Sequence, residues 1–545
     1  MILRFIKLIR MKKWMKYGEE NKIVKILKFT FAFLKNHWFL VAVFIIGLAV
    51  RTIYLNDTIA ISKDQIDHIQ WAKEIFTNGH IWHGARMRGG NGATEVFLGP
   101  FYIYLLSLPA IIGRGYFLLP TILNGLLNTF SIFLIYYLTN IITNSKTAGI
   151  ISAILFAFST AFVVASRTVW NPWYLPFFVL ITFISFIKLV QGKEKFLFIF
   201  ILFLSFSTQL HASALLFIPA FILLWFVYRI KIKHKIIWLY AWLGLIISYL
   251  PMIYHELKHH FENFRNLLQI ILNPSENGVE KVSFFQHFLY AVKKFSESFS
   301  ISLDGRIYES AHGLALWFGS HFEKLFRYSA GIIFLFFCLF LLVKIFQKNH
   351  LNWKNNLLLV PIVTIFLFVL GSNFFSYELF VYYFATVLPI TYIIIAYGLA
   401  SLNKSIIGKI IMVSFLLFFS YINLNSFYFY IRARQHRAIV PASELMNPDM
   451  ILKDQIDLLD YVKKDSLNQG ARFDFLLNWG PVNSANAKTY HYLINLKDIN
   501  VKEDNDVIYL IIDPRIKPLD DTLNGKKVLL DRVFGSIRLI KYQTQ

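Results

Sequence analysis

Long apolar runs separated by short polar junctions dominate the chain. Eleven of them approach or exceed the length of about 20 residues that a helix needs to cross the hydrocarbon core of a membrane. They lie at 38–55, 116–142, 147–165, 173–190, 196–211, 213–229, 236–254, 328–346, 356–371, 379–400 and 406–425. The pattern therefore predicts an α-helical polytopic membrane protein with about eleven transmembrane helices within 38–430.

A long polar loop at 56–115 follows the first run. Within it, Ser62 and Gln65 have the spacing of a capping box and predict a helix over 62–76. Ile66, Ile69 and Ala72 then fall on one apolar face. A helix with this pattern lies flat in the membrane interface instead of crossing it.

Two further polar regions stand out. Residues 255–327 mix charged and aromatic side chains and are predicted to form a second outer loop. In 431–545 a helix is expected at 451–467 and strands at 473–478, 507–513, 527–530 and 536–541. The chain therefore ends in a small soluble α/β domain, expected on the extracytoplasmic side.

The distribution of Lys and Arg predicts the orientation. If the basic lead-in at 1–37 is cytoplasmic, as the positive-inside rule favours, alternate junctions fall inside and outside. The outer junctions then carry only Arg167. The inner junctions carry thirteen basic residues: Lys146, Lys188, Lys193, Lys195, Arg229, Lys231, Lys233, Lys235, Lys344, Lys348, Lys354, Lys404 and Lys409.

The same asymmetry decides how the apolar stretch at 97–113 is interpreted. Letting it cross would reverse every later junction. It is therefore predicted to be a juxtamembrane or re-entrant segment, in which Pro100 and Pro109 limit the helix.

Composition agrees with a multi-pass membrane protein, since 56% of the residues are hydrophobic and 56 are Phe. The net charge of +23 would also fit a nucleic-acid-binding protein. We expect no nucleic acid partner, because much of the charge flanks apolar runs. Cys338 is the single cysteine, so the chain forms no internal disulfide.

Candidate chemistry concentrates in the first loop. Asp64 and Asp67 are three residues apart and share one side of the predicted helix. They form either a solvated acidic face or a pair for acid–base work. Arg86 and Arg88 follow in a glycine-rich segment and are candidates for binding a phosphate, or simply lipid headgroups. Glu95 is expected to face either the substrate cavity that these residues would line or the solvent.

Three residues near the outer junctions are further candidates for binding a substrate: Arg167, Asn171 and His211. His211 is otherwise a hydrogen-bonded residue at a helix end. His68, His80 and His83 lack the fixed spacing of a metal site, so we expect no metal ion and no cofactor.

An ordered set of short motifs resembles a known family. The acid-bearing interfacial helix is followed by Gly-Pro-Phe-Tyr-Ile-Tyr-Leu-Leu at 99–106 and by Arg-x-x-Trp-Asn-Pro at 167–172. With the soluble tail, this order is similar to the GT-C membrane glycosyltransferases. The resemblance is to the family-39 branch of protein O-mannosyltransferases and aminoarabinose transferases. Some relatives carry an acid where this chain has Asn171.

The resemblance implies a GT-C fold and an inverting transfer at the outer face of the cell membrane. A sugar would pass from a polyprenyl-phosphate donor to an envelope lipid, glycan or protein acceptor. Asp64 takes the catalytic position, and Asp67 would hold sugar or acceptor hydroxyls. Two alternatives are a flippase for lipid-linked sugars and an envelope polysaccharide ligase or polymerase.

Overall fold

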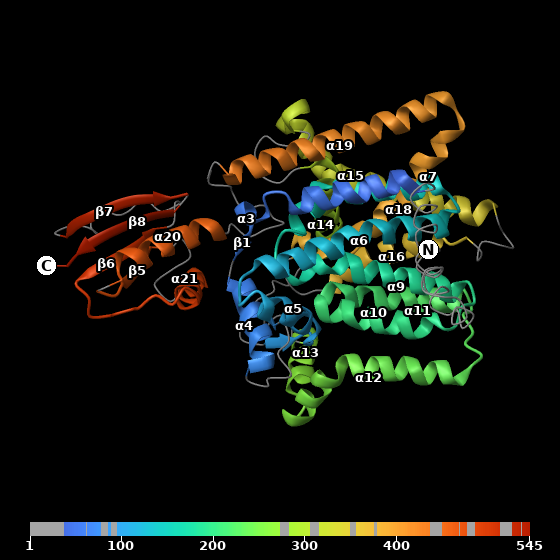
Figure 1. Cartoon of the computed structure of the whole chain (residues 1–545). Helices are drawn as coiled ribbons and strands as arrows, with labels where there is room; N and C mark the ends of the chain where they lie inside the picture. The colour runs from blue at the N-terminus through green and yellow to red at the C-terminus, as the bar shows by residue number, and fades with distance from the viewer. Residues whose placement is uncertain are drawn as a thin grey trace, which may run out of the picture.

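The computed structural model describes residues 37–61, 63–77, 86–88, 95–272, 283–305, 315–348, 356–374, 379–435, 450–467, 469–476, 485–512, 526–535 and 537–544. Figure 1 shows a large bundle of helices and a small sheet-containing domain beyond one end of it. We call this end the domain end. The opposite end, which carries Lys146, Lys193, Lys233 and Lys404, is the basic end. The predicted lead-in lies outside the described residues except for its last residue.

Each of the eleven predicted apolar runs contains a helix. Five described helices are long and apolar enough to cross a membrane, and several shorter apolar helices accompany them. The predicted α-helical, polytopic architecture is therefore confirmed. The bundle consists of a first helix (His37–Thr52), α6 (Leu118–Thr143), α7 (Lys146–Phe158), α8 (Thr160–Ala165), α9 (Leu175–Val190), α10 (Phe196–Leu210), α11 (Phe217–Val227), α12 (Lys235–Lys258), α15 (Ala315–Lys348), α16 (Leu359–Gly371), α18 (Leu388–Ser401) and α19 (Ile406–Gln435).

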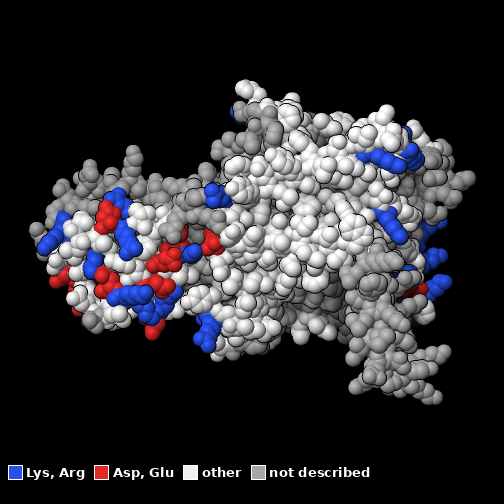
Figure 2. Space-filling view, turned by 45° about the horizontal axis from the view of Figure 1, so that its top comes forward, with Lys and Arg blue, Asp and Glu red and all other residues white. Residues whose placement is uncertain are grey.

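Charge is distributed along the bundle as the junctions predicted. In Figure 2, Lys and Arg gather on the end of the bundle away from the small domain, and the described flank between the two ends shows no charged side chain on the visible face. Large apolar side chains such as Trp242, Ile247 and Phe336 are exposed on the helices. Such a flank suits contact with lipid tails. That the basic end is cytoplasmic stays a prediction.

The stretch at 97–113 forms a helix too short to cross a membrane. α5 (Phe101–Ile112) has 12 residues, about 18 Å of helix. It packs against α4 (Lys63–Thr77) at the domain end (Figure 1). Gln209 accepts a hydrogen bond from the Phe101 amide at 3.2 Å. A Cβ at Gly99 would lie only 2.6 Å from the same side chain, so this close approach requires glycine.

The helix is interrupted between α7 and α8, and two side chains bind the backbone groups that the interruption leaves unpaired. Arg51 is fully buried and donates to the carbonyls of Phe156 (3.2 Å) and Ala157 (3.0 Å), which the break leaves without helical partners. On the other side, the Thr160 amide donates to Asn423 Oδ1 at 2.8 Å. Asn423 Nδ2 in turn donates to the Leu303 carbonyl at 3.0 Å. These bonds join four parts of the bundle at one point.

We expect Asn423→Leu to lower the free energy of unfolding by about 2 kcal/mol, because it leaves a buried amide and a buried carbonyl without partners. Denaturation with SDS in mixed micelles measures the loss. The same substitution at the half-buried Asn425 is the matched control and should change stability by less than about 0.5 kcal/mol. Equal losses of stability at the two positions would contradict the proposed contribution of the Asn423 hydrogen bonds.

The predicted second outer loop at 255–327 contains two described helices, and its side of the membrane stays a prediction. α13 (Glu262–Leu272) does lie at the domain end, but α14 (Phe284–Asp304) packs into the bundle against α15. Two of its buried serines bond to carbonyls of the helix itself. Ser300 donates to the Glu297 carbonyl at 2.9 Å and Ser302 to the Phe299 carbonyl at 2.7 Å. A polar sequence can therefore occupy an apolar bundle.

The C-terminal part is the predicted α/β domain. Its sheet has the order β5 (Arg472–Leu476), β6 (Val507–Ile512), β8 (Ile537–Gln543), β7 (Lys527–Phe534). β5 and β6 are parallel, while β8 pairs antiparallel with both β6 and β7. α20 (Leu452–Asp465) was predicted. α21 (Ala485–Leu496), which connects the two parallel strands, was not.

Hydrogen bonds tie this domain to both ends of the first loop. β1 (Ala60–Ile61) pairs antiparallel with β4 (Met450–Ile451) just after the first helix. Lys453 contacts Asp57 of α3 (Leu55–Thr58) at 2.9 Å. At the other end of the loop, the Tyr492 hydroxyl of α21 donates to the Gly115 carbonyl at 2.9 Å. The domain therefore lies beside α4, the helix that carries the candidate carboxylates.

Candidate functional site

The helix predicted at 62–76 is present as α4, and its burial follows the predicted face; that it lies in the membrane interface stays a prediction. Ile66, Ile69 and Ala72 are fully buried, whereas Asp64 in the first turn is exposed. Ser62, the predicted cap, lies outside the described residues. Because the N-terminal turn of a helix favours negative charge, this position stabilises a carboxylate. Asp64 thus lies at the domain end with its carboxylate accessible.

An aromatic floor lies within range of the negative charge of Asp64. It is built by Tyr382 and Tyr383 of α17 (Val381–Phe384), with Trp170 and Phe380 around them. The Tyr382 ring centroid is 4.7 Å from that of Trp170 and 4.8 Å from that of Tyr383. Burial raises the pKa of the Tyr382 phenol above its usual value, and the neighbouring Tyr383 and the charge of Asp64 add to this shift. The Tyr382 hydroxyl is therefore protonated, and its phenol senses the charge of Asp64.

His211 borders the same floor and is held by a chain of hydroxyl groups. Its Nδ1 accepts from the Ser213 amide at 3.2 Å and lies 2.8 Å from Ser213 Oγ. Ser213 Oγ in turn lies 2.5 Å from Thr386 Oγ1. The His211 ring is 5.1 Å from the Tyr383 ring. Burial lowers the pKa of His211, so the ring is neutral. The structure shows His211 as a hydrogen-bonded residue at a helix end. Its role in substrate binding stays a prediction.

Asn171 and Arg167 are both buried, with protein partners. Asn171 Nδ2 donates to the Leu210 carbonyl at 2.5 Å. The Arg167 guanidinium donates to the carbonyls of Val50 (3.1 Å) and Ile53 (2.7 Å) and to Thr58 Oγ1 (2.6 Å). The structure thus gives Arg167 the task of holding the end of the first helix and α3. Binding of substrate by either residue stays a prediction.

The glycine-rich segment contributes a hairpin. β2 (Arg86–Arg88) pairs antiparallel with β3 (Glu95–Phe97), so that Arg88 is opposite Glu95 and Arg86 opposite Phe97. These four positions share one face of the hairpin. The side chains of Arg86, Arg88 and Glu95 lie outside the described parts, as do His80 and His83. Their predicted roles, and the expected absence of a metal ion, stay predictions.

The hairpin is fixed to the outer part of the bundle. Asn263 of α13 accepts from the Phe97 amide at 2.6 Å and donates to the Phe97 carbonyl at 3.2 Å. The Phe97 ring also lies 5.8 Å from that of His255, near the end of α12. The two arginine positions are therefore held beside the joint between α12 and α13.

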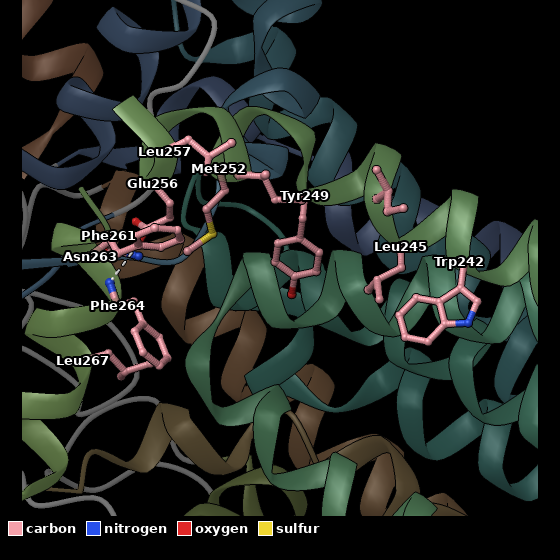
Figure 3. Close-up of a pocket in the computed structure, with 12 residues that line it drawn as sticks. Trp242, Leu245, Tyr249, Met252, Glu256, Leu257, Phe261, Asn263, Phe264 and Leu267 are labelled. Atoms are coloured by element: carbon pink, nitrogen blue, oxygen red, sulfur yellow. Dashed lines mark hydrogen bonds between the residues drawn. The ribbon is translucent and has the colours of Figure 1, made fainter. Parts of the chain in front are cut away.

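An apolar groove of about 570 Å³ opens at this joint. Figure 3 shows Trp242, Leu245, Tyr249 and Met252 of α12 along its length and Phe264 and Leu267 of α13 at its far end. Glu256 is the one acidic residue among its described lining residues and accepts from the Phe264 amide at 3.0 Å. The groove therefore runs from the lipid-facing flank toward the hairpin. This groove could not be predicted from local sequence patterns, because it depends on how two helices meet.

His68 predicts a dependence of stability on pH. Burial lowers its pKa to about 4, although the charge of Asp67 opposes the shift. In the unfolded chain an imidazole titrates near 6.5, so between about 6.5 and 4 the unfolded state binds more protons. The contribution of neutral His68 to the free energy of unfolding is therefore fully present above pH 6.5. It decreases as the pH falls, by about 2 kcal/mol at pH 5.

We expect thermal unfolding of the wild type to shift to a lower temperature between pH 7.5 and pH 5. His68→Leu should show a smaller shift, because the group that titrates has been removed. Residual dependence is expected from His211, which is also buried and neutral. An equal shift in wild type and variant would remove His68 as a source of the effect.

Comparisons with known proteins were made at three levels. No protein-family model and no curated protein matches the sequence. Among solved structures, archaeal oligosaccharyltransferase AglB from Archaeoglobus fulgidus, in complex with an inhibitory peptide and a dolichol-phosphate, is 13% identical with a TM-score of 0.44. That match covers 88% of this chain and 70% of AglB.

The second solved structure is ArnT from Cupriavidus metallidurans bound to undecaprenyl phosphate. It is 12% identical with a TM-score of 0.48, and the match covers 93% of this chain and 98% of ArnT. Both matches extend over most of this chain, and the similarity is one of backbone fold.

Proposed function

We propose that this protein is a membrane glycosyltransferase that takes a sugar from a polyprenyl-phosphate donor at the domain end, which is the extracytoplasmic side. The observation that carries the proposal is the position of Asp64. Its exposed carboxylate begins an interfacial helix beside the aromatic floor of Tyr382 and Tyr383. The resemblance of the sequence to GT-C enzymes gives the acid in this loop the catalytic role.

The transfer is an inverting displacement. An acceptor hydroxyl oxygen forms a bond to the anomeric carbon while the bond from that carbon to the phosphate oxygen breaks. The electron pair leaves with the polyprenyl phosphate, and the hydroxyl proton passes to the Asp64 carboxylate, which acts as general base. Asp67, one turn along α4, is positioned to bind hydroxyl groups of the sugar or acceptor. The protonated Tyr382 supplies a donor close to the reacting atoms.

The donor's two parts match two neighbouring features. The groove between α12 and α13 offers an apolar wall for the prenyl chain at the lipid-facing flank. The hairpin beside it carries Arg86 and Arg88, the chemistry that neutralises a leaving phosphate. Two guanidinium groups would supply this charge, and the proposed mechanism uses no metal ion or cofactor.

One observation favours a second candidate, a flippase for lipid-linked sugars. Glu297 of α14 is buried in the bundle, with Lys294 at 3.2 Å and Arg327 at 3.6 Å. Charged groups inside a membrane protein often mark a pathway. An envelope ligase or polymerase would share the donor chemistry and differ only in the acceptor.

One experiment separates these functions. The full chain is placed in lipid nanodiscs or vesicles with a panel of labelled undecaprenyl-phosphate sugars and envelope extract. We expect release of undecaprenyl phosphate and label on an envelope acceptor. Movement of intact donor across vesicles without any release would contradict the transferase and favour the flippase.

A further inference from the structure

A second cavity lies between the acid-bearing helix and the C-terminal domain. It has a volume of about 460 Å³ and is lined by Gln70, Lys73, Glu74 and Thr77 of α4 and by Tyr492, Asn495 and Leu496 of α21. In Figure 1, α21 is the helix of the small domain that faces α4. The cavity is therefore built jointly by the first loop and the C-terminal domain.

The cavity continues the surface that carries the two carboxylates. Asp64, Asp67, Gln70 and Glu74 follow one another at spacings of three and four residues, so they lie along one side of α4. At a rise of 1.5 Å per residue, Gln70 is about 9 Å and Glu74 about 15 Å along the helix from Asp64. A ligand a few rings long would reach from the cavity to the reacting atoms.

The wall formed by α21 is fixed in place. The Tyr492 side chain is buried and its hydroxyl donates to the Gly115 carbonyl. Gly115 has a φ of +88°, and a Cβ there would lie 2.6 Å from the Tyr492 hydroxyl. Only glycine combines this backbone conformation with this contact. The distance between the two walls is thus set by the end of the first loop.

The chemistry of the described lining residues suits a neutral, hydroxyl-rich ligand. Among them, Lys73 and Glu74 contribute one charge of each sign, and Gln70, Asn495 and Thr77 contribute amide and hydroxyl groups that both donate and accept. Leu496 adds an apolar contact. A phosphorylated or acidic ligand would need an excess of positive charge, and a lipid chain would need an apolar wall.

We propose that this cavity binds the acceptor, and that the acceptor is a neutral oligosaccharide whose terminal hydroxyl reaches Asp64. This inference rests on the proposed function and assigns that function its acceptor class. The C-terminal domain then selects the acceptor, while the bundle binds the donor.

The test measures transfer by the full chain from its labelled polyprenyl-phosphate sugar to neutral oligosaccharides released from the cell envelope. Glu74→Gln and Asn495→Leu change one wall each and should raise the KM for the oligosaccharides about tenfold, with the KM for the donor unchanged. Asn500→Leu, an exposed residue of the same domain outside the cavity, is the matched control and should change neither KM.

The outcomes separate the two proposals. Transfer with an unchanged acceptor KM in both variants would overturn the acceptor site and leave the proposed function standing. Transfer only to a peptide or lipid fraction would overturn the oligosaccharide as acceptor. Absence of any donor turnover by the wild type would overturn the proposed function, and this inference with it.

Discussion

Asp64→Asn is expected to lower the rate of sugar transfer about a thousandfold, the range typical of a lost general base. The amide keeps the size and hydrogen-bonding reach of the carboxylate but cannot accept the proton of the attacking hydroxyl. Folding should be unaffected, because Asp64 is exposed. The measurement is the initial rate of label transfer by purified protein, with its elution from a sizing column as a check of folding.

The matched control is Asp57→Asn, on the same side of the protein. Asp57 contacts Lys453 in a partly exposed ion pair, which contributes at most about 1 kcal/mol. Its transfer rate should stay close to that of the wild type. If Asp64→Asn also transferred at the wild-type rate, the catalytic assignment would be lost.

Arg167→Met is expected to lower the free energy of unfolding by about 3 kcal/mol, because buried polar groups lose a charged donor. The carbonyls of Val50 and Ile53 and the Thr58 hydroxyl would all lose this partner. Since these residues precede α4, the activity should fall as well. SDS titration of purified protein measures the stability, and Arg167→Lys should recover little because an ammonium lacks the planar fork.

Arg432→Met changes an exposed arginine at the domain end of α19 and is the control, with an expected change below about 0.5 kcal/mol. An Arg167→Met protein of wild-type stability but weakened donor binding would contradict the structural role. It would instead give Arg167 the substrate-binding role predicted from the sequence.

The apolar helices of the bundle and the helix α4 were predictable because each follows from local composition. A run of apolar residues has few alternatives in a membrane, and the face of Ile66, Ile69 and Ala72 is legible at helical spacing. The strands of the C-terminal domain were found for a similar reason. Buried β6 is a continuous apolar run, Val507–Ile512, bounded by polar residues.

The helix α14 was missed because its serines make the segment appear soluble. Only the structure shows that the hydroxyls of Ser300 and Ser302 bond to carbonyls of their own helix, and that Ser296 bonds to α15. The helix α21 lacks a continuous apolar face in its first turn. Strands β1 and β4 have two residues each, and nothing local specifies such a distant pairing.

The aromatic floor was hidden inside the predicted span at 379–400. Tyrosines count as apolar in such a run, so Tyr382 and Tyr383 were assigned to the membrane. Pro389 was the available signal, because proline favours the first turn of a helix and α18 begins at Leu388. The tyrosines precede that start and lie at the domain end instead.

The central claim is that a lipid-phosphate headgroup binds beside Asp64 at the domain end. A cryo-electron microscopy map of the full chain in nanodiscs with added undecaprenyl phosphate tests it directly. We predict density for the prenyl chain along the groove between α12 and α13, with the phosphate at the β2–β3 hairpin and facing Asp64. Lipid-phosphate density at the basic end, or a groove occupied while the Asp64 carboxylate faces away from the phosphate, would contradict the claim.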